Sequence, residues 1–210
     1  MFEVVFQDEH LLVLDKPSGL LAVPGRGAEL QDCLSARVQA AIPRALVVHR
    51  LDRDTSGLMV MALSPQAQRE LSRQFALRTV EKRYAAVVWG SPAASAGSVD
   101  LPLRKDFDRP PRHKVDLVGG RPAHTTWRVI ERMNAGPVEQ TRLEVRPTTG
   151  RSHQIRVHLA SLGHPILGDK LYAHAEALAL APRLLLHAGQ ISLAHPCGGH
   201  AMTWTAECPF

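Results

Sequence analysis

The sequence has few cysteines and no long hydrophobic run. Its three cysteines, Cys33, Cys197 and Cys208, are an odd number without CxxC spacing, which argues against a disulfide framework. No apolar run approaches the roughly 18 residues that a membrane-spanning helix needs. Glu3 and Asp8 also interrupt the first apolar stretch, where a signal peptide would need an unbroken apolar core. These absences predict a reduced, cytoplasmic protein with no membrane role.

The sequence also lacks the glycine-rich motifs that bind nucleotides. Neither GxGxxG nor a P-loop is present, so no nicotinamide or ATP cofactor is expected. Acidic residues are fewer than basic ones, 20 against 25, which gives a net charge of +5. That balance favours a polyanionic partner without identifying one. With 210 residues, 45% of them hydrophobic, the chain can form one substantial core, or two lobes that share a sheet.

The hydrophobic pattern alternates between short strands and helices. Strands are expected in the first 22 residues, at 58–63, at 81–89 and, as a hairpin, near the C-terminus. Helices are expected at 28–42, at about 65–78 after the N-cap Ser64, and between Gly150 and Gly163. We therefore predict a single mixed α/β domain of the α+β type over 1–210, rich in antiparallel strands.

The segment HRLDRDTSG, residues 49–57, concentrates two arginines and two aspartates in five residues. By charge alone it is more typical of a salt-bridged turn, in which Asp52 or Asp54 caps Thr55 or Ser56. It resembles, however, the HRLD-x-x-TSG signature of the RluA type of pseudouridine synthase. Members of that family convert uridine in RNA into its C-glycoside isomer. All seven specified positions of the signature are present here.

Four further segments resemble the family in the same order and together cover nearly the whole chain. They are HLLVLDKPSGLLAVPGRG, EKRYAAVVWG, TGRSHQIRVHLASLGHPILGDKLY and RLLLHA. The resemblance implies the pseudouridine synthase catalytic domain: a mixed, largely antiparallel sheet with flanking helices and a central RNA-binding cleft. The separate N-terminal S4 domain of some relatives is not expected. The compact form, with the segments VPGRG and SPAASAGSVDLPL, is most similar to members that act on both 23S ribosomal RNA and a tRNA anticodon stem-loop.

The resemblance assigns the chemistry to Asp52, Tyr84 and Arg156. Asp52 matches the catalytic aspartate. Because uracil must leave ribose C1′, rotate and rejoin through carbon, a carboxylate can act as nucleophile or stabilise an oxocarbenium-like sugar. Burial would raise the pKa of such a carboxyl, and Arg156 matches the arginine that keeps it ionised. Tyr84 matches the tyrosine whose ring can stack on uracil and whose hydroxyl can relay a proton.

Structural roles are the alternatives for these residues. Tyr84 could serve core packing, and Arg156 could bond the end of a neighbouring element. On the expected helix, Arg156 shares a polar face with His153, opposite Leu159 and Leu162, which would point it toward the cleft. An apolar wall of the pocket, or simple core packing, is expected from residues 184–186.

RNA contacts are expected from Arg50 and from a basic loop at 104–114. Arg50 matches a family arginine whose side chain would enter the RNA stem like a wedge. Such a wedge offsets the stacking lost when the target uridine flips out; phosphate contact is its alternative role. The loop suits a phosphate backbone because its cations surround Phe107, although charge alone is equally compatible with a solvated loop. The remaining candidates for RNA binding are Arg104, Lys105, Arg109, Arg112, Lys114, Arg151 and His153.

A zinc site is a rival interpretation of the C-terminal segment. Potential ligands are His195, Cys197, His200 and Cys208. Their spacing is not that of a standard zinc finger, and the Gly-Gly pair among them is typical of a hairpin turn. We therefore expect neither a metal nor a cofactor.

Two other function classes compete with the synthase. A non-catalytic RNA-binding or ribosome-assembly module on the same fold could dispense with Asp52, Tyr84 and Arg156, yet all three are present. A hydrolase using Asp52 with Asp54 is disfavoured, because side chains two residues apart diverge in an extended segment. The sequence thus favours a monomeric RNA-modifying isomerase.

Overall fold

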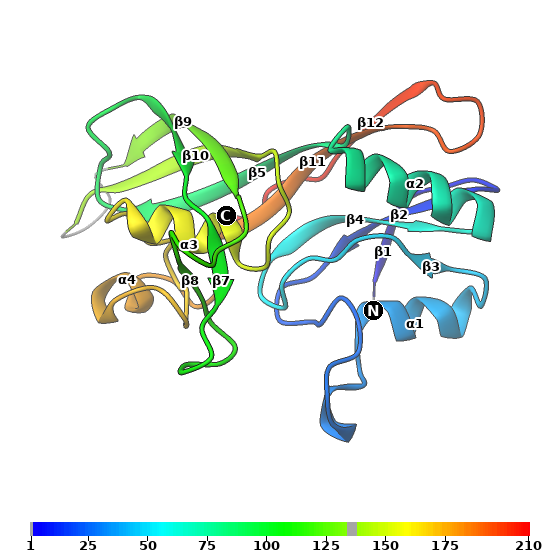
Figure 1. The fold of residues 1–210 in the computed structure, drawn as a ribbon, viewed down its shortest axis with the longest axis horizontal. Coiled ribbons are helices and arrows are strands. Elements are labelled where there is room, and N and C mark those ends of the chain that lie inside the picture. Colours follow the sequence, from blue (N-terminus) through cyan, green and yellow to red (C-terminus); the bar gives the residue numbers. More distant parts are fainter. Residues whose placement is uncertain (1, 134–137) are drawn as a thin grey trace. The chain divides into compact units, whose positions relative to one another are not determined.

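The computed structural model describes residues 2–133 and 138–210, and the chain divides into two compact units (Figure 1). The first unit comprises Met1–Lys82 and His187–Pro209, and the second comprises Arg83–Leu186 with Phe210. Both units combine strands with short helices, and strand pairing is largely antiparallel. The predicted α+β class is therefore confirmed. Among the described residues, no helix is long and apolar enough to cross a membrane.

The sheet of the first unit is organised around one fully buried strand. Its strands are β1 (Glu3–Gln7), β2 (Leu11–Lys16), β3 (Leu46–Val47), β4 (Ser56–Ala62), β11 (Leu186–Ala194) and β12 (Ala201–Thr205). β4 runs antiparallel to β2 and β3 and parallel to β11, while β1 pairs with β2 and β12 with β11. All residues of β4 are buried, which explains its continuous apolar sequence.

Helices of the first unit pack on opposite faces of this sheet (Figure 1). They are α1 (Leu34–Ala41) and α2 (Pro65–Leu77), while the 3-10 turn η1 (Ala28–Leu30) has no buried residue and belongs to neither core. α2 packs on the face that carries Leu11 and Val13 of β2, and α1 packs on the face that carries Leu12 and Leu14. Since successive side chains of a strand point to opposite faces, β2 contributes to both cores.

The α2 helix forms where the sequence predicts it. Ser64 is the N-cap, and its Oγ accepts a hydrogen bond from the Ala67 N–H at 3.2 Å. Pro65 occupies the first helical position, which suits its missing N–H. Leu71 is fully buried and Phe75 packs beside the same core, as their spacing indicates.

The predicted helix over 28–42 is wrong in its first half, because α1 begins only after Cys33. The Leu34 N–H donates to the Leu21 carbonyl at 2.8 Å, and Leu21 and Cys33 form an isolated β-bridge. These contacts hold the backbone at Cys33 extended, with φ −151°. The four-residue spacing of apolar side chains therefore spans two elements, because a contact distant in sequence interrupts the helix.

The second unit has an antiparallel sheet with strand order β5-β10-β9-β6. These strands are β5 (Glu81–Trp89), β6 (Ala96–Asp100), β9 (His124–Met133) and β10 (Gln140–Pro147). A separate two-stranded arm is formed by β7 (Leu103–Lys105) and β8 (His113–Val115), and the helices are α3 (Gln154–Ser161) and α4 (Ala175–Ala179). We call residues 103–115 the β7–β8 arm.

Side chains of β5 alternate as predicted. Ala86 and Val88 belong to the core cluster that includes residues of α3, and Tyr84 packs against that cluster. Val87 and Trp89 lie on the other face, in the cluster that includes Ala177 of α4. The predicted face of Tyr84 is therefore confirmed.

The α3 helix differs from the amphipathic helix that the sequence predicts. Residues 154–159 are all buried, and Arg156 is only 3% exposed. Leu162, predicted on the apolar face, is 40% exposed. The buried polar residues of α3 have specific partners: His158, for example, is hydrogen-bonded to Thr125 and to the Leu101 carbonyl, each at 2.9 Å. Pairing of this kind lets polar side chains enter a core without a large desolvation cost.

Candidate active site

The HRLDRDTSG segment forms most of the loop between β3 and β4 and the first two residues of β4, in the first unit. The Thr55 N–H donates to the Asp52 carbonyl at 3.2 Å, which closes a tight turn around Asp52. Asp52 and Asp54 are half-buried, whereas Arg50 and Arg53 are exposed. The loop therefore leaves the Asp52 side chain partly accessible while its backbone is fixed.

A buried lysine fixes the backbone of this loop through hydrogen bonds. Lys16, at the end of β2, is 0% exposed. Its Nζ donates to the carbonyls of Pro17 at 2.8 Å, Leu20 at 2.8 Å and Arg53 at 2.9 Å. Backbone carbonyls are present at every position, so the sequence gives no indication of this role for Lys16.

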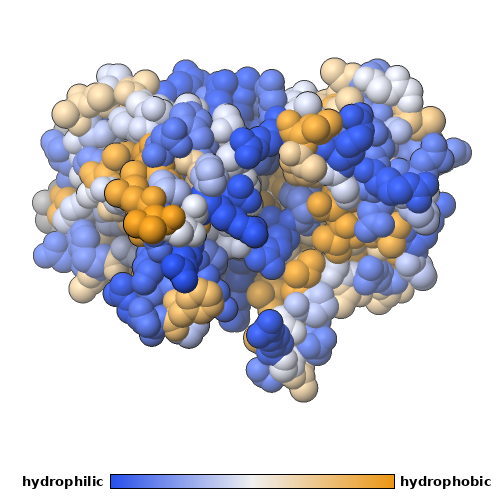
Figure 2. All heavy atoms as spheres, viewed as in Figure 1, coloured by the Kyte–Doolittle hydropathy of each residue, from blue (hydrophilic) through white to orange (hydrophobic). Residues whose placement is uncertain are grey.

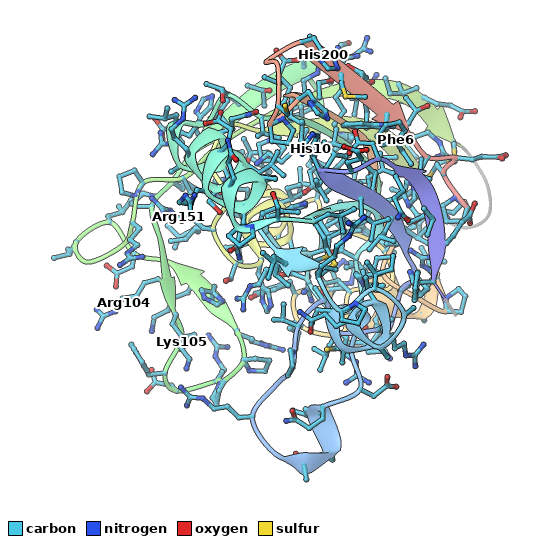
Figure 3. All side chains as sticks on the ribbon, turned by 90° about the vertical axis from the view of Figure 1, so that its right-hand side faces the viewer. Phe6, His10, Arg104, Lys105, Arg151 and His200 are labelled. Atoms are coloured by element: carbon cyan, nitrogen blue, oxygen red, sulfur yellow. The ribbon has the colours of Figure 1, made fainter. Side chains whose placement is uncertain are left out.

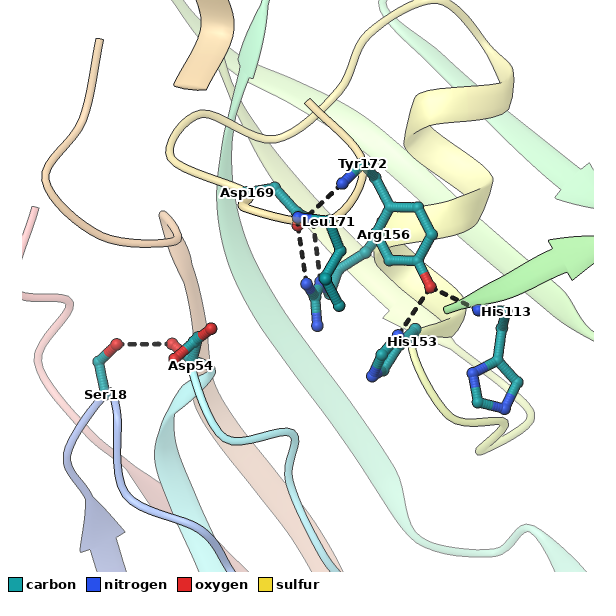
Figure 4. Close-up of polar contacts among 8 residues, drawn as sticks. All are labelled: Ser18, Asp54, His113, His153, Arg156, Asp169, Leu171 and Tyr172. Carbon is teal, nitrogen blue, oxygen red and sulfur yellow. Dashed lines mark hydrogen bonds and ion pairs between the residues drawn. The ribbon is translucent and has the colours of Figure 1, made fainter. Parts of the chain in front are cut away.

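Further bonds join the same turn to the loop. Ser18 Oγ donates to the Asp54 carbonyl at 2.7 Å (Figure 4). The Gly19 N–H donates to the Arg53 carbonyl, and Arg53 Nε donates back to the Gly19 carbonyl, both at 3.0 Å. The KPSG turn thus clamps the two residues that follow Asp52. Arg53 therefore bonds the turn through its side chain as well as its backbone.

His49 anchors the start of the loop. Its Nε2 accepts a hydrogen bond from the Val60 N–H of β4 at 2.9 Å, and its ring stacks on Phe75 of α2 with centroids 4.4 Å apart. Burial, with the charge of Lys82 adding to it, lowers the pKa of His49 to about 3. The ring therefore stays neutral near neutral pH, as its acceptor role at Nε2 requires. Sequence reasoning gave His49 no role.

The end of the loop is fixed against β11. Ser56 Oγ and His187 Nδ1 are hydrogen-bonded at 2.9 Å, and both side chains are buried. Gly57 has φ +110°, and a Cβ at this position would lie 2.4 Å from the Ala188 carbonyl oxygen. Close strand packing therefore requires glycine at position 57, while Ser56 is hydrogen-bonded to the buried His187.

Arg156 and Tyr84 lie in the second unit, whereas Asp52 lies in the first. Arg156 Nε donates to Asp169 Oδ2 at 2.8 Å and its Nη2 donates to Asp169 Oδ1 at 2.7 Å. Sequence reasoning missed this buried carboxylate, although Asp169 is part of the GDKLY segment. The pairing of Arg156 with Asp52 stays a prediction, as do the roles of all three residues.

Candidate RNA-binding side chains cluster on the β7–β8 arm. Figure 3 shows Arg104 and Lys105 on this arm, and both are exposed. Arg109 is also exposed, while Arg112 and Lys114 are half-buried. Their contribution to RNA binding stays a prediction.

The arm carries carboxylates that offset part of its charge. Asp106 is 1% exposed and pairs with Arg109 at 3.1 Å and with Lys114 at 3.4 Å. Burial raises the pKa of the Asp106 carboxyl, but bonds to these two cations outweigh that effect and the pKa is lowered. Two aspartates against five Lys and Arg leave residues 104–114 with a net charge of +3. Asp106 therefore fixes part of the basic arm.

Exposed hydrophobic side chains are scattered over the surface, and Figure 2 shows a mainly hydrophilic face with small hydrophobic groups. Three of them lie on the β7–β8 arm or directly after it: Phe107 at 66%, Leu117 at 75% and Val118 at 101% exposure. The cationic groups of Arg104 and Lys105 each lie 5.6 Å from the Phe107 ring centroid. An exposed ring between cations suits stacking on a nucleic-acid base.

The other two RNA-binding candidates have local contacts in the second unit. Arg151 Nε donates to the Pro122 carbonyl at 3.1 Å. His153 adopts a left-handed backbone with φ 57° at the start of α3, and its Nδ1 is hydrogen-bonded to Tyr172 at 2.7 Å. Both side chains are half-buried, and their contact with RNA stays a prediction.

The remaining sequence hypotheses have simpler structural explanations. Leu184 and Leu186 are buried in a core cluster, which favours the packing alternative. Within the described part of the chain, no three His, Cys, Asp or Glu side chains are grouped to hold a metal. His195 instead pairs with Asp8 at 2.9 Å and stacks on His200, with His10 at its edge, so these side chains join two hairpin turns (Figure 3).

Comparison with known proteins gives consistent matches. A family model described as RNA pseudouridylate synthase matches residues 10–161. A curated relative from Escherichia coli (strain K12), named dual-specificity RNA pseudouridine synthase RluA, is 49% identical over 207 residues, covering 99% of this chain and 93% of the relative. A relative of the same name from Yersinia pestis is also 49% identical and covers 99% of both chains.

Solved structures show the same similarity at the level of the fold. Human RNA pseudouridylate synthase domain containing 1 matches with a TM-score of 0.84 and 25% identity, covering 100% of this chain and 84% of that one. Human RNA pseudouridylate synthase domain containing 4 matches with a TM-score of 0.77 and 25% identity, covering 99% of this chain and 88% of that one.

Proposed function

The chain belongs to the RNA pseudouridylate synthase family, and we propose that it modifies one uridine of 23S ribosomal RNA and one of a tRNA anticodon stem-loop. It is an RNA pseudouridine synthase, an isomerase. One observation supports the proposal of two substrates: the chain is 49% identical to relatives named for dual specificity, over almost their full length. The proposal includes a monomer that acts in the cytoplasm, where both RNAs are made in bacteria.

Asp52 is the proposed catalytic carboxylate. The N1–C1′ bond of uridine must break and a C5–C1′ bond must form, so that N1 gains a hydrogen and C5 loses one. A carboxylate held on a fixed turn can attack covalently, or it can stabilise the positive sugar in between. The clamped backbone around Asp52 supports this role, because accurate positioning of the reacting group is a large part of catalysis.

Tyr84 and Arg156 are the proposed supports of that carboxylate. The Tyr84 ring offers a face on which detached uracil can stack, and its hydroxyl can relay the proton that leaves C5. Arg156 carries a charge that does not titrate in the physiological range, so it can keep Asp52 ionised. Arg50, exposed on the same loop as Asp52, is the proposed wedge that replaces the flipped uridine.

Transcripts test this function directly. We expect the protein, without added metal or cofactor, to form pseudouridine in a 23S fragment and in a tRNA anticodon stem-loop. Carbodiimide adducts mapped by primer extension identify the modified positions. Transcripts with the mapped uridine replaced by cytidine serve as the control and should give no stop. Product at other uridines would overturn the substrate assignment, and no product on any RNA would favour the non-catalytic module.

Charge reversal on the β7–β8 arm tests its role in RNA binding. Arg109→Glu with Arg112→Glu removes two cations, so the slope of log affinity against log salt should become shallower by about 1 to 2. Affinity for the stem-loop should fall at least about 10-fold at low salt. The measurement is a filter-binding or anisotropy titration at several salt concentrations. Arg69→Glu with Arg73→Glu, on an exposed face of α2, is the matched control, because it also reverses two cations. If the slope were unchanged, the β7–β8 arm would be a solvated surface loop that does not contact the RNA phosphates.

A further inference from the structure

Asp169 and Arg156 form a buried ion pair with two parallel hydrogen bonds. Their side chains are 0% and 3% exposed, and both carboxylate oxygens accept from the guanidinium. This geometry uses Nε and one side of Nη2, and it directs the other N–H donors away from Asp169. Because a guanidinium is planar, two such bonds leave it little rotational freedom.

The same carboxylate organises the segment that follows it. Asp169 Oδ1 also accepts from the Leu171 N–H at 2.9 Å and from the Tyr172 N–H at 3.2 Å. Bonds to the second and third residue onward form a compact turn. Tyr172 is therefore placed by the same group that holds Arg156.

Tyr172 contacts both Arg156 and the β7–β8 arm. The guanidinium carbon of Arg156 lies 5.1 Å from the centroid of the Tyr172 ring. The Tyr172 hydroxyl accepts from the backbone N–H of His113 in β8 at 2.7 Å, and it is hydrogen-bonded to His153 Nδ1 at 2.7 Å (Figure 4). One side chain therefore joins the arm, the start of α3 and the buried arginine.

We propose that Asp169 and Tyr172 are positioning residues that act through Arg156. Asp169 fixes the guanidinium in one orientation, and Tyr172 ties the β7–β8 arm to that orientation, so that RNA bound on the arm is aligned with Arg156. The inference rests on the proposed function of Arg156 as a support of the catalytic carboxylate. It assigns a role to the GDKLY segment, to which neither the sequence pattern nor the proposed mechanism assigned one.

The alternative is that the pair only stabilises the fold. A purely stabilising pair would make the loss of Asp169 lower the melting temperature while leaving kcat of the folded protein unchanged in every background. A positioning pair would make that loss costly only while Arg156 itself is present. The two explanations therefore differ in how Asp169 and Arg156 variants combine.

Asp169→Asn is the central variant, because it keeps the size and one accepting oxygen but removes the charge and replaces the second acceptor with an NH2 donor. We expect kcat on the stem-loop to fall about 100-fold, the size of effect that an ångström-scale displacement can cause. KM should change less than about 3-fold, since RNA-binding groups stay in place. On an Arg156→Lys background the same change should cost less than about 3-fold. Equal losses in both backgrounds would overturn the proposal.

Asp8→Asn is the matched control. Asp8 also accepts two N–H bonds, from His10 and Leu11, and pairs with the side chain of His195. It has the same local bonding pattern but no connection to Arg156, so kcat should stay within about 2-fold of the wild type. A loss equal to that of Asp169→Asn would show that any such turn matters, and would overturn the proposal.

Tyr172→Phe tests the role of Tyr172. It also tests the proposal if Asp169→Asn does not fold. It removes one oxygen and keeps the ring beside Arg156, so we expect kcat to fall about 10-fold with the melting temperature nearly unchanged. Combined with Arg156→Lys it should add less than about 2-fold. Unchanged kcat in Tyr172→Phe would remove Tyr172 from the proposal.

A spectroscopic measurement separates this inference from the proposed function. In the wild type, the Nε–H resonance of Arg156, assigned by its absence in Arg156→Lys, should exchange slowly with water. It should exchange at least about 10-fold faster in Asp169→Asn and be unchanged in Asp8→Asn. If the wild-type protein makes no pseudouridine but Asp169→Asn still speeds this exchange, the proposed function is wrong. The inference that Asp169 positions Arg156 would then still hold. Unaltered exchange in Asp169→Asn would overturn the positioning.

Discussion

Asp52→Asn is expected to lower pseudouridine formation by at least about a thousand-fold while leaving RNA affinity within about 2-fold of the wild type. Asparagine has nearly the same shape, so the turn closed by the Asp52 carbonyl and the Thr55 N–H should persist. It has no negative charge, so it can neither attack C1′ nor stabilise a positive sugar well. Single-turnover assays on the tRNA stem-loop, with binding measured separately, give both quantities.

Asp54→Asn is the control for this variant. Asp54 is bonded to the KPSG turn through its backbone carbonyl, which asparagine retains. It carries the same charge on the same loop, so a general electrostatic effect would appear in both variants. We expect Asp54→Asn to keep kcat within about 3-fold. Full activity in Asp52→Asn would remove Asp52 from catalysis, and equal losses in both would point to the charge of the loop as a whole.

The sequence predicted elements well where local chemistry determines them. The α2 helix begins at Ser64-Pro65 because a cap and a proline act within one turn. The alternation of β5 follows from the pleat of a strand, so the face of Tyr84 could be assigned before any tertiary contact was known. Where the element is set by its own residues, a pattern is sufficient.

Distant contacts explain what the sequence could not show. The start of α1 depends on a bridge between Cys33 and Leu21, and the orientation of Arg156 depends on Asp169. The pattern of α3 was equally misleading, since its buried polar residues are paired with groups from other elements. In each example the local pattern gives no indication of which distant residue is the partner.

The same limit applies to the HRLD loop. The motif identified the loop and its aspartate, but the groups that hold the loop are Lys16, acting on carbonyls, and His49, acting on a backbone N–H. Backbone acceptors and donors are the same at every position, so spacing cannot reveal them. The position of the loop could be predicted and the groups that hold it could not.

Gly57→Ala should be the most destabilising small substitution in the loop. The new Cβ would lie 2.4 Å from the Ala188 carbonyl oxygen and 2.6 Å from its nitrogen, and φ +110° is strained for alanine. Overpacking against backbone typically costs about 1–3 kcal/mol and backbone strain a similar amount, so we expect a loss of about 2–6 kcal/mol. Urea unfolding followed by circular dichroism measures it as a lower midpoint.

Gly19→Ala separates the two causes of that loss. Gly19 has φ +84°, but a Cβ there would meet nothing within 4 Å. Its two bonds to Arg53 use only the N–H and carbonyl of Gly19, which alanine keeps. Gly19→Ala should therefore cost only the strain, about 1 kcal/mol. If Gly57→Ala cost no more than this, β4 and β11 would have to separate easily at Gly57. The Ser-Gly pair would then not be what fixes the end of the HRLD loop.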